Sequence, residues 1–244
     1  MTEAPVHNPL AQFEVYPIIP LKFGELDLSF TNASLWMVIV LGMATSLLMM
    51  GVRNRQLVPG RWQSMSEMLV EFISSVVTDN AGKEAMKFFP LIFSLFMFIL
   101  LSNLCGMIPL SFTVTSHIVV TFALAATLFV GITILGFVKH GMHFLSLFLP
   151  AGTPWWMVPL MIPIELTSYF MRPVSLSIRL AANMLAGHLL LKIVAGFVMI
   201  GLLGIFPFGF LLIFTGFEIF IACLHAYIFT LLICIYLNDA LNLH

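Results

Sequence analysis

Long apolar runs dominate this chain and restrict it to folds that suit a lipid bilayer. Hydrophobic residues make up 61% of its 244 residues and charged residues only 9%, whereas charged residues make up about a quarter of an ordinary soluble domain. Three runs, at 30–51, 88–108 and 117–138, have roughly the 20 apolar residues that a helix needs to cross the hydrocarbon core. Because backbone polar groups must be hydrogen-bonded inside lipid, these runs predict helices. The predicted fold class is an all-α polytopic membrane protein.

The second half of the chain carries two longer apolar stretches. These stretches, roughly 155–205 and 207–237, are each too long for one perpendicular crossing, so they predict tilted or broken helices. Counting each as one crossing gives about five spans. An additional amphipathic helix is expected at 61–80, because its apolar residues recur on one face while Glu67 and Glu71 lie elsewhere. We expect this helix on the membrane surface; packing against a soluble partner is the alternative.

The distribution of basic residues predicts the orientation. Basic side chains cluster after the first span, before the second and after the third, whereas the loop 109–116 carries no charge. Under the positive-inside rule, the amino-terminal segment 1–29 is expected outside, and five crossings return the carboxyl terminus to the inside. These basic side chains, in chain order, are Arg53, Arg55, Arg61, Lys83, Lys87 and Lys139.

Several functional classes find no support in the sequence. The formal net charge of −1 gives no basic excess for binding nucleic acid. The chain shows no phosphate-binding loop, nucleophile elbow or metal-spaced His or Cys cluster, so no cofactor is predicted and the chain is not expected to catalyse a covalent step itself. Its three cysteines lie singly in apolar runs and are interpreted as core residues. It lacks an internal repeat of the kind found in inverted-repeat transporters.

The strongest candidate site is the segment RPVSLSIRLAANMLAGH at 172–188, which places ionisable groups at membrane depth. Such groups are costly in lipid and persist where they face protein or water. At helical spacing, six polar residues share one face around Arg179: Glu165, Ser168, Arg172, Ser175, Arg179 and Asn183. For Arg179 the alternative is a structural ion pair with Glu165 or Glu218, and for Arg172 a structural role is also open. Pro173 could kink the stripe.

Small residues and a second polar face complete the constellation. Ala182 and Gly187 are among the small residues that allow another backbone to approach closely, and His188 points away from the face of Arg179. Farther along, Glu218 and His225 share one face of an apolar helix and could relay a proton. A weaker alternative is a metal such as zinc bound by His188, Glu218 and His225.

These motifs closely resemble subunit a, the proton-channel stator subunit of the membrane sector of F-type ATP synthases. The resemblance rests on RPVSLSIRLAANMLAGH, on NLCGMIP at 103–109 and on EIFIACLHAYIFTLLICIYLNDA at 218–240. It implies five crossings and a surface helix, with helices at 142–205 and 207–240 forming a strongly tilted hairpin against a ring of c subunits. The function it implies is proton conduction that drives rotation and ATP synthesis.

The resemblance also implies roles for individual residues. Arg179 is expected to face the ring carboxylates and to separate two offset half-channels. The outer half-channel is expected to contain Asn183, His188, Glu218 and His225, and the inner one Glu165, Ser168, Arg172 and Ser175. Some bacterial relatives carry histidine at the position of Glu218, and many carry glutamine at that of His225, so the order of proton transfer is left open.

Partners and location follow from the same resemblance. The expected partners are the c-subunit ring, the peripheral-stalk b subunits and the bilayer, with no nucleic acid. The terminal CIYLNDALNLH is similar to alphaproteobacterial and mitochondrial members, and we favour a bacterial inner membrane over a mitochondrial one. Two alternatives stay open: a self-contained proton-coupled transporter and a structural membrane anchor.

Overall fold

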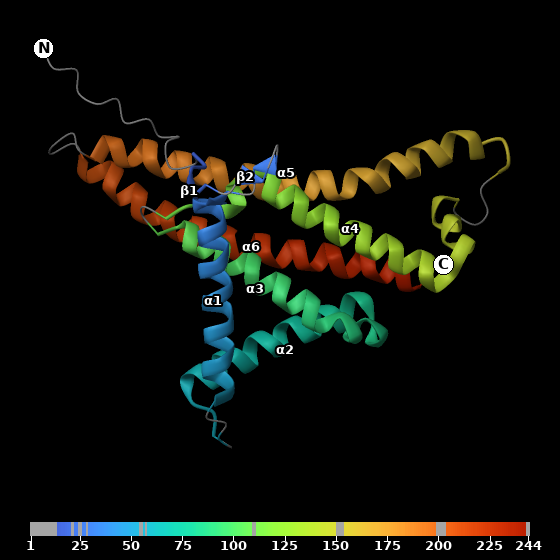
Figure 1. Ribbon diagram of the computed structural model, residues 1–244, viewed down its shortest axis with the longest axis horizontal. Helices are drawn as coiled ribbons and strands as arrows, with labels where there is room; N and C mark the ends of the chain where they lie inside the picture. The colour runs from blue at the N-terminus through green and yellow to red at the C-terminus, as the bar shows by residue number, and fades with distance from the viewer. Residues whose placement is uncertain are drawn as a thin grey trace, which may run out of the picture.

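The computed structural model describes residues 14–20, 22–23, 26–27, 29–53, 56, 58–108, 111–149, 154–198 and 204–242. The described part contains six α-helices and three short 3₁₀ helices (Figure 1). The α-helices are α1 (Asn32–Arg53), α2 (Arg61–Ala81), α3 (Phe89–Gly106), α4 (Ile118–His140), α5 (Val158–Val198) and α6 (Ile205–Leu241). The 3₁₀ helices are η2 (Lys83–Phe88), η3 (Val114–Ser116) and η4 (Gly141–Phe148).

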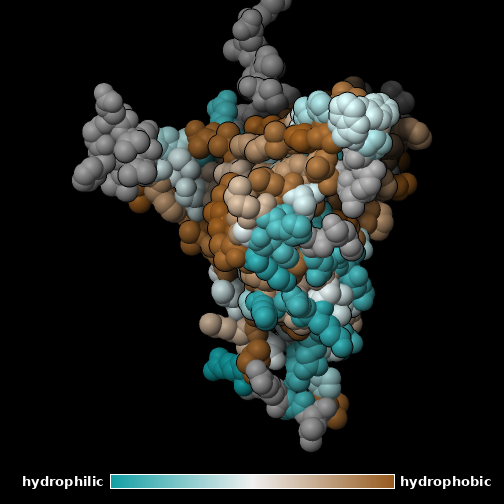
Figure 2. All heavy atoms as spheres, turned by 90° about the vertical axis from the view of Figure 1, so that its right-hand side faces the viewer, coloured by the Kyte–Doolittle hydropathy of each residue, from teal (hydrophilic) through white to brown (hydrophobic). Residues whose placement is uncertain are grey.

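Five helical segments are long and apolar enough to cross a membrane, which confirms the all-α polytopic fold class. Their outer surfaces carry large apolar side chains, such as Val119, Val138 and Ile213, each at least 75% exposed. In Figure 2, brown hydrophobic surface lies beside a gathering of hydrophilic residues on the face that it shows. Apolar surface that would be costly in water is suited to lipid.

The two carboxyl-terminal helices are too long to stand upright in a bilayer. At 1.5 Å per residue, the 41 residues of α5 and the 37 of α6 extend about 60 and 55 Å, roughly twice the thickness of the hydrocarbon core. They run antiparallel, and α4 lies against both (Figure 1). Pro163 and Pro173 lie inside α5, which continues through both as one gently curved helix. The helix is therefore not interrupted at Pro173, where the sequence suggested a local kink.

The largest apolar core lies where α3 meets α6. Ile92, Phe96 and Ile99 of α3 are buried in one cluster with Phe229 and Ile233 of α6. This packing places α6 in the centre of the molecule, with α5 and α4 on one side and α2 on the other. The position of the α6 polar groups is therefore set by apolar contacts along its other faces.

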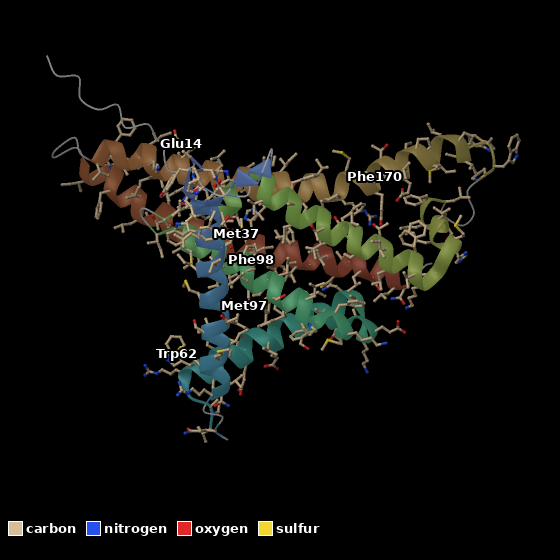
Figure 3. The ribbon with its side chains drawn as sticks, in the orientation of Figure 1. Glu14, Met37, Trp62, Met97, Phe98 and Phe170 are labelled. Atoms are coloured by element: carbon tan, nitrogen blue, oxygen red, sulfur yellow. The ribbon has the colours of Figure 1, made fainter. Side chains whose placement is uncertain are left out.

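The amphipathic helix α2 uses part of its apolar face for internal packing. Ile73 and Val76 are buried in the core cluster, whereas Met68 is 67% exposed. Near its start, Trp62 is exposed beside the end of α1 (Figure 3). Ser66 approaches Gly51 of α1 so closely that a Cβ at Gly51 would overlap its hydroxyl. The close approach fixes the corner between α1 and α2.

Two short pairs of antiparallel strands precede α1 and were not predicted from the sequence. Strand β1 (Pro17–Ile19) pairs antiparallel with β4 (Phe30–Thr31), and β2 (Lys22–Phe23) with β3 (Leu26–Asp27). The buried Asn32 fastens this segment to α1: its amide donates to the Glu14 carbonyl at 3.0 Å, and its oxygen accepts from the Tyr16 amide at 3.2 Å. A polar side chain thus satisfies backbone groups at the entry of the first span.

Two glycines on α4 provide a matched test of this packing. A Cβ at Gly136 would overlap the buried ring of Phe144, whereas one at Gly131 would meet nothing within 4 Å. We expect Gly136→Ala to destabilise the subunit by about 1–3 kcal/mol through overpacking, and Gly131→Ala to be neutral or stabilising because alanine favours helix. Thermal denaturation of the detergent-solubilised complex measures both. Equal behaviour of the two variants would contradict the Gly136–Phe144 contact.

Candidate functional site

Most of the polar stripe on α5 lies on an exposed surface of the subunit. Ser168, Ser175, Arg179 and Asn183 are exposed, and Glu165 and Arg172 are half-buried. The opposite face of the same helix is buried, with Leu176, Leu180, Met184 and His188 at 6% exposure or less. The helix therefore turns its apolar side inward and its polar stripe outward, the reverse of what lipid contact favours.

Arg179 makes no hydrogen bond or ion pair with the residues that the structure describes. The structural pairing considered with Glu165 or Glu218 is therefore not observed. Ala182 and Ala186 are also exposed, so small side chains lie on the same helix near the guanidinium. Ala181, the neighbour of Ala182 in the sequence, is instead buried inside the subunit.

Two polar pairs join α5 to α6 on the carboxyl-terminal side of Arg179. The amide of Asn183 contacts Nε2 of His225 at 2.5 Å, and Nδ1 of His225 contacts the carbonyl of Ile221 at 2.8 Å. Donation from Nδ1–H to the carbonyl leaves Nε2 to accept from the Asn183 amide, which assigns the tautomer. In the second pair, Nδ1 of His188 lies 3.6 Å from Oε1 of Glu218.

Glu218 is buried in a space that a glycine leaves open. The residue is 3% exposed, and neither carboxyl oxygen hydrogen-bonds a described residue. A Cβ at Gly187 would lie 2.5 Å from Oε1, so the carboxyl group fits there because position 187 has no side chain. A buried carboxyl beside an imidazole is an arrangement that can exchange a proton.

Arg172 has a different environment from Arg179. Its Nη1 donates to Oδ2 of Asp239 at 3.0 Å, and its guanidinium lies 5.4 Å from the Tyr169 ring centroid and 4.9 Å from that of Tyr236. Ion pairing and cation–π contact together hold it against α6. These contacts are those of a structural anchor, the alternative that the sequence left open for Arg172.

Sequence reasoning missed two residues that the structure brings to these sites. Asp239 pairs with Arg172, and Thr113 contacts His188. Asn103, the first residue of the NLCGMIP motif, donates to the Ala222 carbonyl at 3.2 Å and accepts from Thr115 at 2.8 Å. The available signal was the run of hydroxyl residues at 111–116, which looked like an uncharged surface loop but is buried along its whole length.

The geometry does not support the zinc alternative. Within the described ranges, no group of three His, Cys, Asp or Glu side chains is arranged to hold a metal ion. His188 faces Glu218, whereas His225 is occupied by Asn183 and a backbone carbonyl.

Comparison with known proteins identifies the family. The family model described as ATP synthase A chain matches residues 34–238. The chain is a member of the ATP synthase subunit a family. Proteins named ATP synthase subunit a are similar to it over nearly their full length. The one from Paramagnetospirillum magneticum is 51% identical, with 97% of this chain and 99% of the relative covered. The one from Rhodospirillum rubrum is 51% identical, with 98% of this chain and 100% of the relative covered. The one from Parvibaculum lavamentivorans is 53% identical, with 96% of this chain and 94% of the relative covered.

Membership confirms the predicted family and gives the function at a coarse level. As a member of this family, the chain is a multi-span membrane component of the F-type ATP synthase, with roles in ATP synthesis and proton transport. It works in a complex with other ATP synthase subunits, in an energy-transducing inner membrane. A stand-alone transporter and a mere anchor are both set aside, because the chain belongs to a multi-subunit machine.

The hollow at Gly187 generates a prediction for this subunit a. We expect Gly187→Ala to displace the Glu218 carboxyl group and slow ATP-driven proton pumping by about tenfold or more, because misplacing a reacting group by about 1 Å has effects of that size. Gly196→Ala on the same helix is the control, since a Cβ there meets nothing within 4 Å. Pumping is measured in inverted membrane vesicles with matched amounts of assembled complex. Normal pumping by Gly187→Ala would refute the close contact.

Proposed function

We propose that this subunit conducts protons through two offset half-channels separated by Arg179, which exchange protons with carboxylates on a rotating ring of c subunits. The observation that carries the proposal is an exposed arginine on a membrane-spanning helix that has no anionic partner among the described residues of its own chain. A permanent cation in that position is costly unless another component supplies the counter-charge. A carboxylate on a neighbouring subunit has the required charge.

The surface around Arg179 supports close passage of another helix. Ala182 and Ala186 are exposed beside it, and small side chains let helix backbones approach within a membrane. Small side chains also let successive ring carboxylates pass without steric obstruction. Arg179 attracts each one in its ionised form.

The outer half-channel is proposed to contain the two polar pairs on the carboxyl-terminal side of Arg179. In the Glu218–His188 and Asn183–His225 pairs, Glu218, His188 and His225 are buried groups that can accept and donate protons, and the exposed Asn183 amide hydrogen-bonds the His225 ring. A proton that enters here neutralises a ring carboxylate, which can then rotate into lipid.

The inner half-channel is proposed to run along Glu165, Ser168, Arg172 and Ser175. There the ring carboxylate releases its proton before it meets Arg179 again. Arg172 contributes mainly by anchoring this end of α5 through Asp239. Arg179 cannot relay a proton because its guanidinium stays protonated, so it blocks a direct leak between the channels. Each charge that crosses supplies about 2.3 kcal/mol per 100 mV.

The orientation is proposed to be amino terminus outside and carboxyl terminus inside. Lys139, at the end of α4, pairs with Glu84 of η2 at 2.8 Å, which brings two of the basic segments to the same side of the molecule. By the positive-inside rule, this side is the inner one. The exposed Trp62 and Met68 of α2 are proposed contacts for the peripheral-stalk b subunits.

The central role of Arg179 predicts a specific loss. Arg179→Ala should abolish proton-driven ATP synthesis while leaving assembly largely intact, because the side chain holds no partner within the described part of the chain. Arg179→Lys should rescue poorly, because lysine is a titratable point charge without a planar fork. Arg61→Ala, at an exposed position of α2, is the control. ATP synthesis at normal rates in Arg179→Ala membranes would refute the role.

The two half-channels predict a change of sidedness across Arg179. In a background lacking Cys105, Cys223 and Cys234, single cysteines at Ser168 and Ser175 should react with silver ions or small thiol reagents added inside. Cysteines at Glu218 and His225 should react from outside, since one continuous path would collapse the gradient. A cysteine at Val130, an exposed apolar position of α4, should react poorly from both sides because it faces lipid. Equal labelling of Ser168 and His225 positions from one side would contradict the arrangement.

A further inference from the structure

Thr113 contacts His188 on the side of the ring opposite Glu218. We propose that Thr113 is a positioning residue of the outer half-channel, whose hydroxyl holds the His188 imidazole with Nδ1 toward Glu218 whether or not the imidazole carries a second proton. This inference rests on the proposed function, because it gives Thr113 a role in the proton path through His188. Thr113 belongs to the buried 111–116 segment.

The geometry places His188 between two partners. Thr113 is fully buried, and its Oγ1 lies 3.2 Å from Nε2 of His188. On the other side of the ring, Nδ1 lies 3.6 Å from Oε1 of Glu218. The three side chains come from the segment before η3, from α5 and from α6. They form one continuous line of polar atoms through the ring.

The hydroxyl suits this position because it can both donate and accept. When His188 is neutral with its proton on Nδ1, Nε2 accepts a hydrogen bond from the Thr113 O–H. When both nitrogens are protonated, Nε2–H donates to the same oxygen after the hydroxyl rotates. No buried imidazole nitrogen is left unpaired on this side in either state, a condition that is otherwise costly. A methyl group in place of the hydroxyl cannot meet either requirement.

The surrounding backbone makes room for Thr113 and fixes its place. A Cβ at Gly106 would lie 2.7 Å from Cγ2 and 2.9 Å from Oγ1 of Thr113, so the threonine fits because position 106 has no side chain. The hydroxyl of Ser111 donates to the Cys105 carbonyl at 2.6 Å, and that of Ser116 to the Thr113 carbonyl at 2.7 Å. The segment is thus held against the end of α3.

The same segment is also tied to α6. Thr115 donates to Asn103 Oδ1 at 2.8 Å, and Asn103 in turn donates to the carbonyl of Ala222, one turn beyond Glu218, at 3.2 Å. Thr113 and Glu218 are therefore positioned by one hydrogen-bonded framework. In the described part of the chain, the titratable groups that act on His188 are Glu218 from α6 and Lys192 from α5.

The test compares Thr113→Val, which removes the hydroxyl at similar volume, with Thr113→Ser, which retains it. Thr113→Val should slow ATP-driven proton pumping in inverted vesicles roughly five- to thirtyfold, as expected for loss of one buried hydrogen bond, and should displace the pH profile of pumping. Thr113→Ser should keep the wild-type profile. Thr127→Val is the control, because its exposed hydroxyl bonds within its own helix to Ala123 at 2.7 Å and should leave pumping unchanged.

A double variant separates this inference from the proposed function. In a His188→Gln background, Thr113→Val should add little further loss, because coupled residues deviate from additivity. If His188→Gln alone pumps normally, the proposed outer path through His188 is wrong. If His188→Gln is slow but Thr113→Val keeps the wild-type pumping rate and pH profile, the role of Thr113 is overturned. It is also overturned if the reductions in pumping rate caused by Thr113→Val and His188→Gln are fully additive in the double variant. Thr113→Ala removes the same hydroxyl and replaces the valine variant if valine prevents assembly.

Discussion

The cost of an unpaired cation in a membrane is the constraint on which the rest of this structure depends. Arg179 lies on an exposed face of a helix that is long and apolar enough to span the bilayer, with no counter-charge among the described residues. A cation there costs from a few to more than 10 kcal/mol depending on its surroundings. This cost supports the proposal that a neighbouring protein supplies the counter-charge of Arg179. The same need for a counter-charge explains why an isolated transporter is a poor description of the chain.

Polar pairs across α5 and α6 keep that exposed face in register. Arg172, Asn183 and His188 follow one another along α5. Their partners on α6 are Asp239, His225 and Glu218, whose sequence numbers decrease in the same order. This descending order is what antiparallel helices require. Such polar pairs are few in an apolar interface, and each forms in only one relative position of the two helices. They can therefore fix the register of α5 against α6, because apolar contacts alone distinguish one register from another only weakly. The Arg172–Asp239 pair and the proposed proton-exchange site at Glu218 thus share one helix interface.

Much of the fold was predictable because lipid imposes strict rules on sequence. The apolar runs gave the all-α polytopic class, and the two overlong stretches gave tilted helices, because hydrocarbon thickness and helix rise leave little freedom. Helical periodicity also predicted that the polar residues around Arg179 share one face of the helix, whereas the outward direction of that face was implied by the family resemblance. The two strand pairs before α1 were missed because their strands contain only two or three residues each. The single helix through Pro173 agrees with the long helix at 142–205 that the resemblance implied, although the structure ends it at Val198.

Sequence alone determined which residues are out of place in a membrane and the face of the helix on which each lies. Composition and periodicity suffice for this. The free energy of transferring a side chain into lipid depends on the residue type, and the helix face on which it lies depends only on its spacing from neighbours in the sequence. The tertiary structure decided which of these residues meet: that Arg172 finds Asp239 while Arg179 finds no partner among the described residues, that His225 takes Asn183, and that His188 lies between Glu218 and Thr113. Those pairings join positions 30 to 75 residues apart. They depend on how far α6 slides along α5 and on the space left open at Gly106 and Gly187, and neither quantity is encoded in any local pattern.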